Sequence, residues 1–150
     1  MTDASDVDQA IFRWLLSIWT IGHRLKLGMT QHTRAVNGLT LEQTMALCAI
    51  QLSGGQLSLG ELAAQLGRTP QTVSTMVRRL EALQLVQRSR DQAGDLRRVF
   101  VRISPRGEES VFGFRRAIPS VLPRLFPAPN PVDFARLHEA ARLLSEFLEP

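Results

Sequence analysis

The stretch Thr69-Pro70-Gln71-Thr72-Val73-Ser74-Thr75-Met76-Val77-Arg78-Arg79-Leu80 decides the fold, because it predicts a helix with one apolar and one polar side. Thr69 is a suitable N-cap, and Pro70 suits the first helical position, where no backbone donor is missed. The apolar residues recur at helical spacing and predict a core face: Val73, Met76, Val77 and Leu80. Gln71, Thr75 and Arg78 then point away from the core, and this side carries no carboxylate. We expect it to contact a partner.

A second, shorter helix is predicted just before this one. Ser58 and Glu61 have the spacing of a capping box, which predicts a helix from Leu59 to Leu66. Gly67 then allows the chain to turn into the next helix. Two short helices joined by a tight, glycine-containing turn predict a helix-turn-helix, whose second helix is narrow enough to enter the major groove of DNA.

Two strands are predicted after the helix-turn-helix. Residues 85–90 form the first, and residues 97–103 alternate apolar and polar side chains as a second. Residues 91–94 supply the turn between them. A hairpin after a helix-turn-helix is a wing, and this one has Arg88, Arg90, Arg97 and Arg98 near its loop. We expect the tip to meet phosphates or to enter a minor groove.

With these elements the chain resembles the MarR family of winged-helix transcriptional regulators. The resemblance rests on Asp95-Leu96-Arg97, followed at the family's spacing by Ile103-Ser104-Pro105-Arg106-Gly107, where that family has Leu-Thr-x-x-Gly. Residues 39–43 resemble the start of the family's second helix, and residues 80–86 its exit from the recognition helix. The match covers about Leu39 to Gly107. Ile-Ser for Leu-Thr is one departure, and Gln84 in place of the usual turn glycine is another.

The flanking segments are predicted to be helical. Residues 5–35 carry two adjacent apolar stripes, which predict a helix buried on several sides. Residues 41–52 form a helix capped by Thr40. A helix that starts at Ser104-Pro105 should bend at Pro119 and Pro123 and run to about Leu125. A last helix follows Asn130-Pro131.

The expected architecture is a mainly α, single MarR-like domain over residues 1–150. It has a winged helix-turn-helix at about 39–104 with a two-stranded β-wing. The flanking helices, at about 5–36 and 105–149, form a dimerisation lobe. The second apolar stripe of the first helix is most simply covered by another subunit. The resemblance implies a homodimer in which the terminal helices of both chains interlock.

Charge and cysteine content narrow the class of protein. The net charge is +4, but residues 57–107 hold nine arginines against four acidic residues, so +5, and the remainder carries −1. Cys48 is the single cysteine, which excludes an intramolecular disulfide and a thiolate metal site within one chain. We expect Cys48 to pack as a small buried side chain rather than to sense oxidation. No apolar run is long enough for a membrane span, and the acidic start does not resemble a signal peptide. A cytoplasmic protein is expected.

Base contact is expected from Gln71, Thr75 and Arg78, since Gln can pair with adenine and Arg with guanine. A solvated helix face is the alternative. Phosphate anchors are expected at Ser58, Thr72 and Ser74. Asp95 and Arg97 are two residues apart, so in an extended segment they share one face, where the carboxylate can hold the guanidinium. The resemblance implies that Arg97 enters the minor groove, and an exposed salt bridge of little worth is the alternative. The full set of candidate DNA-binding residues is Ser58, Thr69, Gln71, Thr72, Ser74, Thr75, Arg78, Arg79, Arg90, Arg97 and Arg98.

The resemblance also implies a small effector, often a phenolic or aromatic acid, bound between the two lobes. By position, Trp19, His23, Met45 and Phe112 could line such a site, although core packing would explain each of them. The three histidines are too scattered to suggest a metal site, and no cofactor motif is present.

The sequence therefore predicts a ligand-responsive repressor that binds a pseudo-palindromic operator in double-stranded DNA as a homodimer. The alternative is a winged-helix module for protein interaction or architecture, without an effector. An enzyme is not expected, because no nucleophile–base pair, phosphate loop or paired carboxylates can be assigned.

Overall fold

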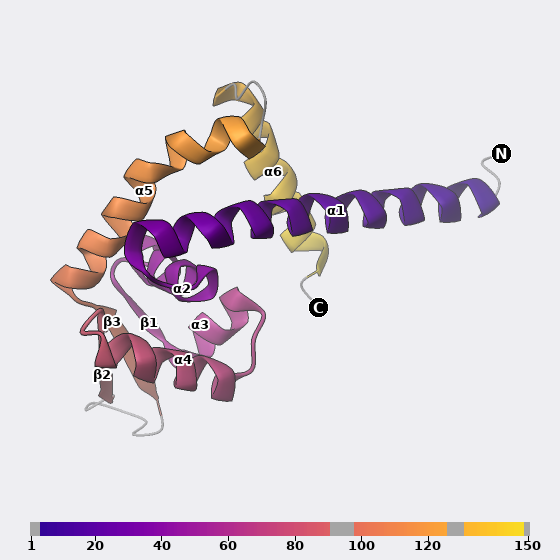
Figure 1. The fold of residues 1–150 in the computed structure, drawn as a ribbon. Coiled ribbons are helices and arrows are strands. Elements are labelled where there is room, and N and C mark those ends of the chain that lie inside the picture. The colour runs from indigo at the N-terminus through magenta and orange to yellow at the C-terminus, as the bar shows by residue number, and fades with distance from the viewer. Residues whose placement is uncertain (1–3, 91–97, 126–130, 149–150) are drawn as a thin grey trace.

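The computed structural model describes residues 4–90, 98–125 and 131–148. Its elements follow in the order α1 (Ala4–Asn37), α2 (Leu41–Leu52), β1 (Gln56–Ser58), α3 (Leu59–Leu66), α4 (Pro70–Ala82), β2 (Val86–Arg90), β3 (Val99–Ile103), α5 (Pro105–Leu125) and α6 (Pro131–Leu148). Figure 1 shows the sheet and helices α2 to α4 gathered in one body, above which α1 and α5 pass. The predicted winged helix-turn-helix and its flanking helices are confirmed.

The wing belongs to a three-stranded antiparallel sheet in the order β1-β3-β2, rather than to a two-stranded one. The hairpin pairs Val86 with Ile103 and Arg90 with Val99. On its other side β3 pairs with β1, where Leu57 lies opposite Val101. The third strand joins the wing to the start of α3, so the wing is anchored to the helix-turn-helix on both edges of its central strand.

The apolar core lies between α2, α3, α4 and the sheet. Its fully buried side chains come from each of these elements: Ala46, Leu47, Ile50, Leu62, Val73, Val77, Leu80 and Val101. The face of α4 predicted to be apolar is therefore the face that packs. Burying a Leu or Val side chain contributes about 1.5–3 kcal/mol, so this body has its own source of stability.

Helix α5 starts at a tightly built corner. Ser104 Oγ donates to Gln84 O at 2.7 Å and accepts from the Gly107 amide at 3.0 Å, so the predicted cap is present. A Cβ atom on Gly107 would lie 2.2 Å from Leu85 O, which explains why glycine is required there. The helix continues to Leu125, as predicted. It rises from the base of the wing, packs on α1 and α2, and ends near the start of α6 (Figure 1).

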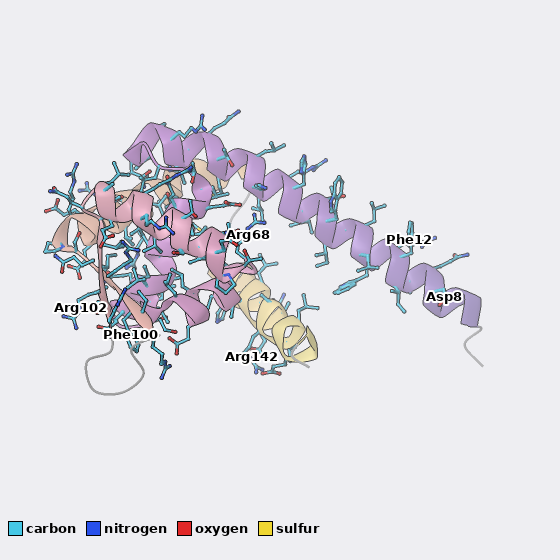
Figure 2. All side chains as sticks on the ribbon, turned by 90° about the horizontal axis from the view of Figure 1, so that it is seen from below. Asp8, Phe12, Arg68, Phe100, Arg102 and Arg142 are labelled. Carbon is cyan, nitrogen blue, oxygen red and sulfur yellow. The ribbon has the colours of Figure 1, made fainter. Side chains whose placement is uncertain are left out.

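The first helix has two parts with different surroundings. Its C-terminal part packs on α2 and α5, and Asn37 Nδ2 donates to Thr44 and Ser110, each at 3.4 Å. Its N-terminal part projects away from the body (Figure 1) and carries side chains on all sides (Figure 2). The large apolar side chains exposed there are Ile11, Phe12, Trp14, Leu15, Leu16, Ile18, Trp19 and Ile21. We call residues 8–21 of α1 the arm.

Candidate nucleic-acid interface

The turn between α3 and α4 sets the direction of α4. Gly67 has φ 58°, a left-handed conformation that glycine adopts without the Cβ clash of other residues. The Arg68 amide donates to Ala63 O at 3.0 Å, which closes the end of α3. Thr69 then caps α4 by accepting from the Thr72 amide at 3.3 Å, and Pro70 takes the first helical position. These are the caps expected from the sequence.

The side of α4 opposite the core is polar and exposed. Gln71, Thr75 and Arg78 all lie on this exposed side, which agrees with their spacing. Thr75 Oγ1 donates to Gln71 O at 3.2 Å, and the Thr69 and Thr72 hydroxyls lie 2.9 Å apart. These three hydroxyls therefore use local partners but remain at the surface. We call the exposed residues Thr69, Gln71, Thr72, Thr75, Arg78 and Arg79 the polar face of α4.

The guanidinium groups of this face are available to a ligand. Neither Arg78 nor Arg79 forms an ion pair with the residues that the structure describes. The only acidic residue of α4 is Glu81, in its last turn and outside the polar face. The face thus presents cations, hydroxyls and an amide without a competing carboxylate, which suits phosphates and base edges.

Two of the predicted serines are less accessible. Ser58 is 7% exposed, and its Oγ accepts from the Glu61 amide at 3.2 Å in the capping box of α3. Its hydroxyl is therefore engaged within the protein. Ser74 is half-buried beside the core face of α4. The accessible part of the candidate set is the polar face rather than these two serines.

The wing contributes further arginines. Arg90 and Arg98 are both exposed, at the end of the paired part of β2 and just before β3. The Arg98 guanidinium lies 5.6 Å from the centre of the Phe100 ring, within cation–π range. Arg97 and Asp95 lie outside the described residues. Arg88, which we placed near the wing loop, instead forms an ion pair with Glu81 of α4 at 2.7 Å.

The start of α3 carries an ionised carboxylate close to the wing. Hydrogen bonds from Ser58 lower the pKa of Glu61, and the positive charge of Arg98 lowers it further. Glu61 Oε2 accepts from the Ser58 amide at 2.8 Å, which completes the capping box. Glu61 thus stabilises the N-terminal end of α3, where a negative charge is favourable.

A large cavity separates α1 from α4. Its volume is about 1050 Å³. Apolar side chains from α1, α2, α3 and α4 line it: Leu25, Met29, Leu41, Met45, Leu66 and Met76. The polar residues Gln71, Thr72, Thr75 and Arg79 also line it, so the cavity shares residues with the polar face of α4. Cavities of this size and mixed lining are typical of sites for small molecules.

The cavity carries an excess of positive charge. Lys26, Arg68 and Arg79 line it together with a single carboxylate, that of Glu42, which is paired with Arg68. The pair joins α2 to the turn before α4, and Figure 2 shows Arg68 at that turn. An apolar space bordered by surplus cations favours an anionic ligand with an apolar body.

The four residues predicted to line an effector site lie in different places. Met45 lines the cavity, and Trp19, His23 and Phe112 lie outside it. Trp19 and His23 stack on one another on α1, with ring centres 5.3 Å apart and planes 8° apart. Phe112 is exposed on α5, where the Arg116 guanidinium lies 5.7 Å from its ring centre. Helical spacing did not indicate which part of α1 borders the cavity.

Cys48 packs against the core, as expected from its position in α2. Burial raises the pKa of its thiol, while the charge of Arg115 opposes that shift. The thiol form is therefore favoured at neutral pH, and a thiol is far less reactive than a thiolate. Among the described residues, no three acidic, histidine or cysteine side chains gather as metal ligands. Within the same residues, none of the helices could span a membrane.

The comparisons with known proteins agree with this geometry. Residues 37–98 match a model of the MarR family. No curated protein matches the sequence. Sco3205, a MarR family transcriptional regulator from Streptomyces coelicolor solved in complex with DNA, is 22% identical with a TM-score of 0.77, over 99% of this chain and 90% of that one.

Two further solved structures have the same fold. A mutant MarR from E. coli, complexed with operator DNA, is 18% identical with a TM-score of 0.72, over 98% of this chain and 99% of that one. BpsR from Bordetella bronchiseptica, whose DNA binding is regulated by 6-hydroxynicotinic acid, is 26% identical with a TM-score of 0.60, over 84% of this chain and 98% of that one. The predicted resemblance is thereby confirmed.

Proposed function

We propose that this protein is a homodimeric repressor that binds a pseudo-palindromic DNA operator. The premise is that residues 37–98 match a model of the MarR family and that the chain has the fold of MarR structures solved with DNA. The observation that carries the proposal is the polar face of α4. It is exposed and free of carboxylates, and its arginines are not paired with described residues. It also lies beside a wing with further arginines.

The polar face suits readout of a major groove. Gln71 can form two hydrogen bonds with adenine and Arg78 two with guanine, each contributing about 1–3 kcal/mol of discrimination. Thr69, Thr72 and Thr75 supply hydroxyls for phosphates, which position a protein on DNA without reading sequence. Arg90 and Arg98 extend the positive charge along the wing towards the neighbouring groove, and the resemblance adds Arg97.

The arm supports the homodimer. Its exposed apolar side chains form a surface that a single chain leaves in water, and such surfaces mark association sites. A second copy of the chain offers the same apolar arm, and a two-fold interface is the commonest way in which identical chains associate. Two-fold symmetry would place two α4 helices in successive major grooves, with half-sites about 10 bp apart. A dimer bound there would exclude other proteins from that DNA, which is repression.

Selection of genomic fragments on the purified protein tests this function. The recovered fragments are titrated again at several salt concentrations. We expect one inverted-repeat motif and a steep fall of affinity with salt, because cations of the protein displace counterions from phosphates. Recovery of random duplex, or of no duplex, would contradict the proposal and would favour an architectural or protein-interaction module, in which the arm recruits a partner chain.

The cavity supports control by a small anion. A ligand there would contact Gln71, Thr72, Thr75 and Arg79, the side of α4 that is proposed to meet DNA. Regulation of BpsR by a small aromatic acid, 6-hydroxynicotinic acid, is in keeping with this ligand class. Ligand binding and DNA binding would then oppose one another, and by linkage each would weaken the other by the same factor.

Release of the selected duplex by benzoate, with uncharged benzamide as the matched compound, tests the ligand class. We expect benzoate to weaken binding more than benzamide does at equal concentration and constant ionic strength. Met45→Trp, which places a large ring in the cavity, should abolish this difference while DNA binding is retained. Equal effects of both compounds on both proteins would contradict an anion site in this cavity.

A further inference from the structure

We propose that Glu81 is a positioning residue, which fixes the direction of the wing relative to α4 by holding Arg88. Its consequence for DNA rests on the proposed function. Glu81 Oε1 accepts from the backbone amide of Arg88 at 3.3 Å. Glu81 Oε2 accepts from Arg88 Nε at 2.7 Å and lies 2.7 Å from Arg88 Nη2. One carboxylate thus holds both the backbone and the guanidinium of the same strand residue.

Helix α4 alone does not account for a carboxylate at this place. Glu81 lies in the last turn, where the partial negative charge of the helix end disfavours an acid. In a helix that approaches DNA, an unpaired carboxylate would also repel phosphates. The interaction with Arg88 offsets both effects. The bridge to the wing therefore explains why the single acid of α4 lies at this end of the helix.

Between α4 and β2, the backbone hydrogen bonds of the described residues outside the β2–β3 ladder reach only as far as Leu85. Gln84 has φ 61°, its amide donates to Glu81 O at 2.8 Å, and the Leu85 amide donates to Leu80 O at 2.9 Å. On the other side Ser104 donates its amide to Leu85 O at 3.0 Å. The Glu81 carboxylate carries the constraint beyond these contacts, into β2, because Arg88 is a member of the paired strand.

Holding Arg88 also places the arginines further along the wing. Side chains alternate along a strand, so Arg88 and Arg90 point to the same face of the sheet. In the β2–β3 ladder Arg88 lies opposite Val101 and Arg90 lies opposite Val99, which follows Arg98. A wing that turned about the corner would carry Arg90 and Arg98 with it. The Glu81–Arg88 bridge therefore adds to the anchoring of the sheet and biases where these cations lie relative to the polar face of α4.

The expected effect is on orientation rather than on folding. Both side chains are about one-third exposed, and such pairs bias an equilibrium by up to about fivefold. A bias of this size hardly changes the fraction of folded protein, but it changes the fraction whose wing and α4 can contact one duplex together.

The DNA test uses the variants Glu81→Gln, Arg88→Gln and the double variant on a duplex recovered by the selection. Glu139→Gln is the matched control, because Glu139 also pairs with an arginine, Arg142, on an exposed helix surface far from the wing. We expect each single variant to bind about three- to fivefold more weakly. Hydroxyl-radical protection should fall in the flanking minor groove and not under α4. The double variant should bind no more weakly than either single variant.

A direct phosphate contact by Arg88 would give a different pattern. Glu81→Gln would then free the guanidinium and tighten binding, Arg88→Gln would weaken it, and the proposal would be overturned. Equal behaviour of Glu81→Gln and Glu139→Gln would overturn it as well.

A measurement without DNA separates this proposal from the proposed function. Residual dipolar couplings of the amides in α4 and in the β2–β3 hairpin report the angle between the two elements. We expect one well-defined angle in the wild type and an altered or averaged angle in Glu81→Gln. If the wild type selected no duplex, the proposed function would fail, and these couplings would still decide the role of Glu81. Identical couplings in both proteins would overturn it.

Discussion

The winged body and the arm both carry many apolar side chains but bury them differently. In the body, side chains such as Leu47 and Leu80 are fully buried among α2, α3, α4 and the sheet. On the arm, Leu15 is 52% exposed and Trp19 is 66% exposed. An apolar pattern along a helix therefore predicts that a face will be covered, but it does not show whether the same chain or another covers it.

The two regions should therefore respond differently to substitution. The body closes its own core and presents a polar face, so its stability should depend on internal packing. In the part of the chain that the structure describes, the large apolar side chains of the arm are exposed, so the arm should depend on a second chain to cover them. Substitutions in the body should change the free energy of unfolding, and substitutions on the arm should change association.

The largest effect is expected at the corner of the body, for Gly107→Ala. The added Cβ would lie 2.2 Å from Leu85 O and 2.7 Å from Ile103 Cγ1, and backbone has to move to relieve this clash. We expect a loss of about 3 kcal/mol or more in the free energy of unfolding, measured by urea denaturation.

Gly113→Ala is the matched control on the same helix. A Cβ there has no neighbour within 4 Å. It should leave stability unchanged or raise it by up to about 1 kcal/mol, since alanine favours helix. Equal losses in both variants would show that the corner is not closely packed against Gly107.

The next effect is expected on the arm, for Leu15→Lys. If a second chain covers Leu15, the substitution removes about 1.5–3 kcal/mol of apolar burial, so the dimer dissociation constant should rise by roughly ten- to a hundredfold. Sedimentation equilibrium measures this. Leu52→Lys is the control, because Leu52 is 87% exposed at the end of α2. Unchanged association in Leu15→Lys would mean that the arm is not the dimer surface.

A smaller effect of opposite sign is expected for Gln84→Gly. Gln84 has φ 61°, which costs a residue with a Cβ atom about 1–2 kcal/mol, and the greater freedom of unfolded glycine offsets part of that gain. We expect a net stabilisation of up to about 1 kcal/mol in thermal unfolding. Gln65→Gly, in the exposed part of α3, should instead destabilise by about that amount. Stabilisation by both, or by neither, would contradict strain at Gln84.

The parts of this fold that could be predicted are those with local causes. The caps at Thr40, Ser58 and Thr69 and the turn at Gly67 were predicted, because a cap requires particular residues at short spacing. The corner at Gln84 was recognised as a departure from the usual glycine, and its positive φ explains why glycine is usual there.

The parts that were missed depend on residues far apart in the chain. Strand β1 covers only Gln56–Ser58, too short for a pattern, and it exists because β3 pairs with it. The Glu81–Arg88 bridge crosses a corner that no periodicity describes. Trp19 and His23 were expected at an effector site, but the cavity starts at Gly22 on α1, where the helix meets the body. Arg97 remains a prediction, because it lies outside the described residues.

We propose that the polar face of α4 reads bases in two symmetric half-sites. Base preferences of the wild type and of Gln71→Ala, measured by selection from a randomised duplex library, test it most directly. We expect that Gln71→Ala loses preference at one pair of positions related by the two-fold axis, while preferences elsewhere are kept. An even loss of affinity at every position, or an unchanged set of preferences, would contradict it.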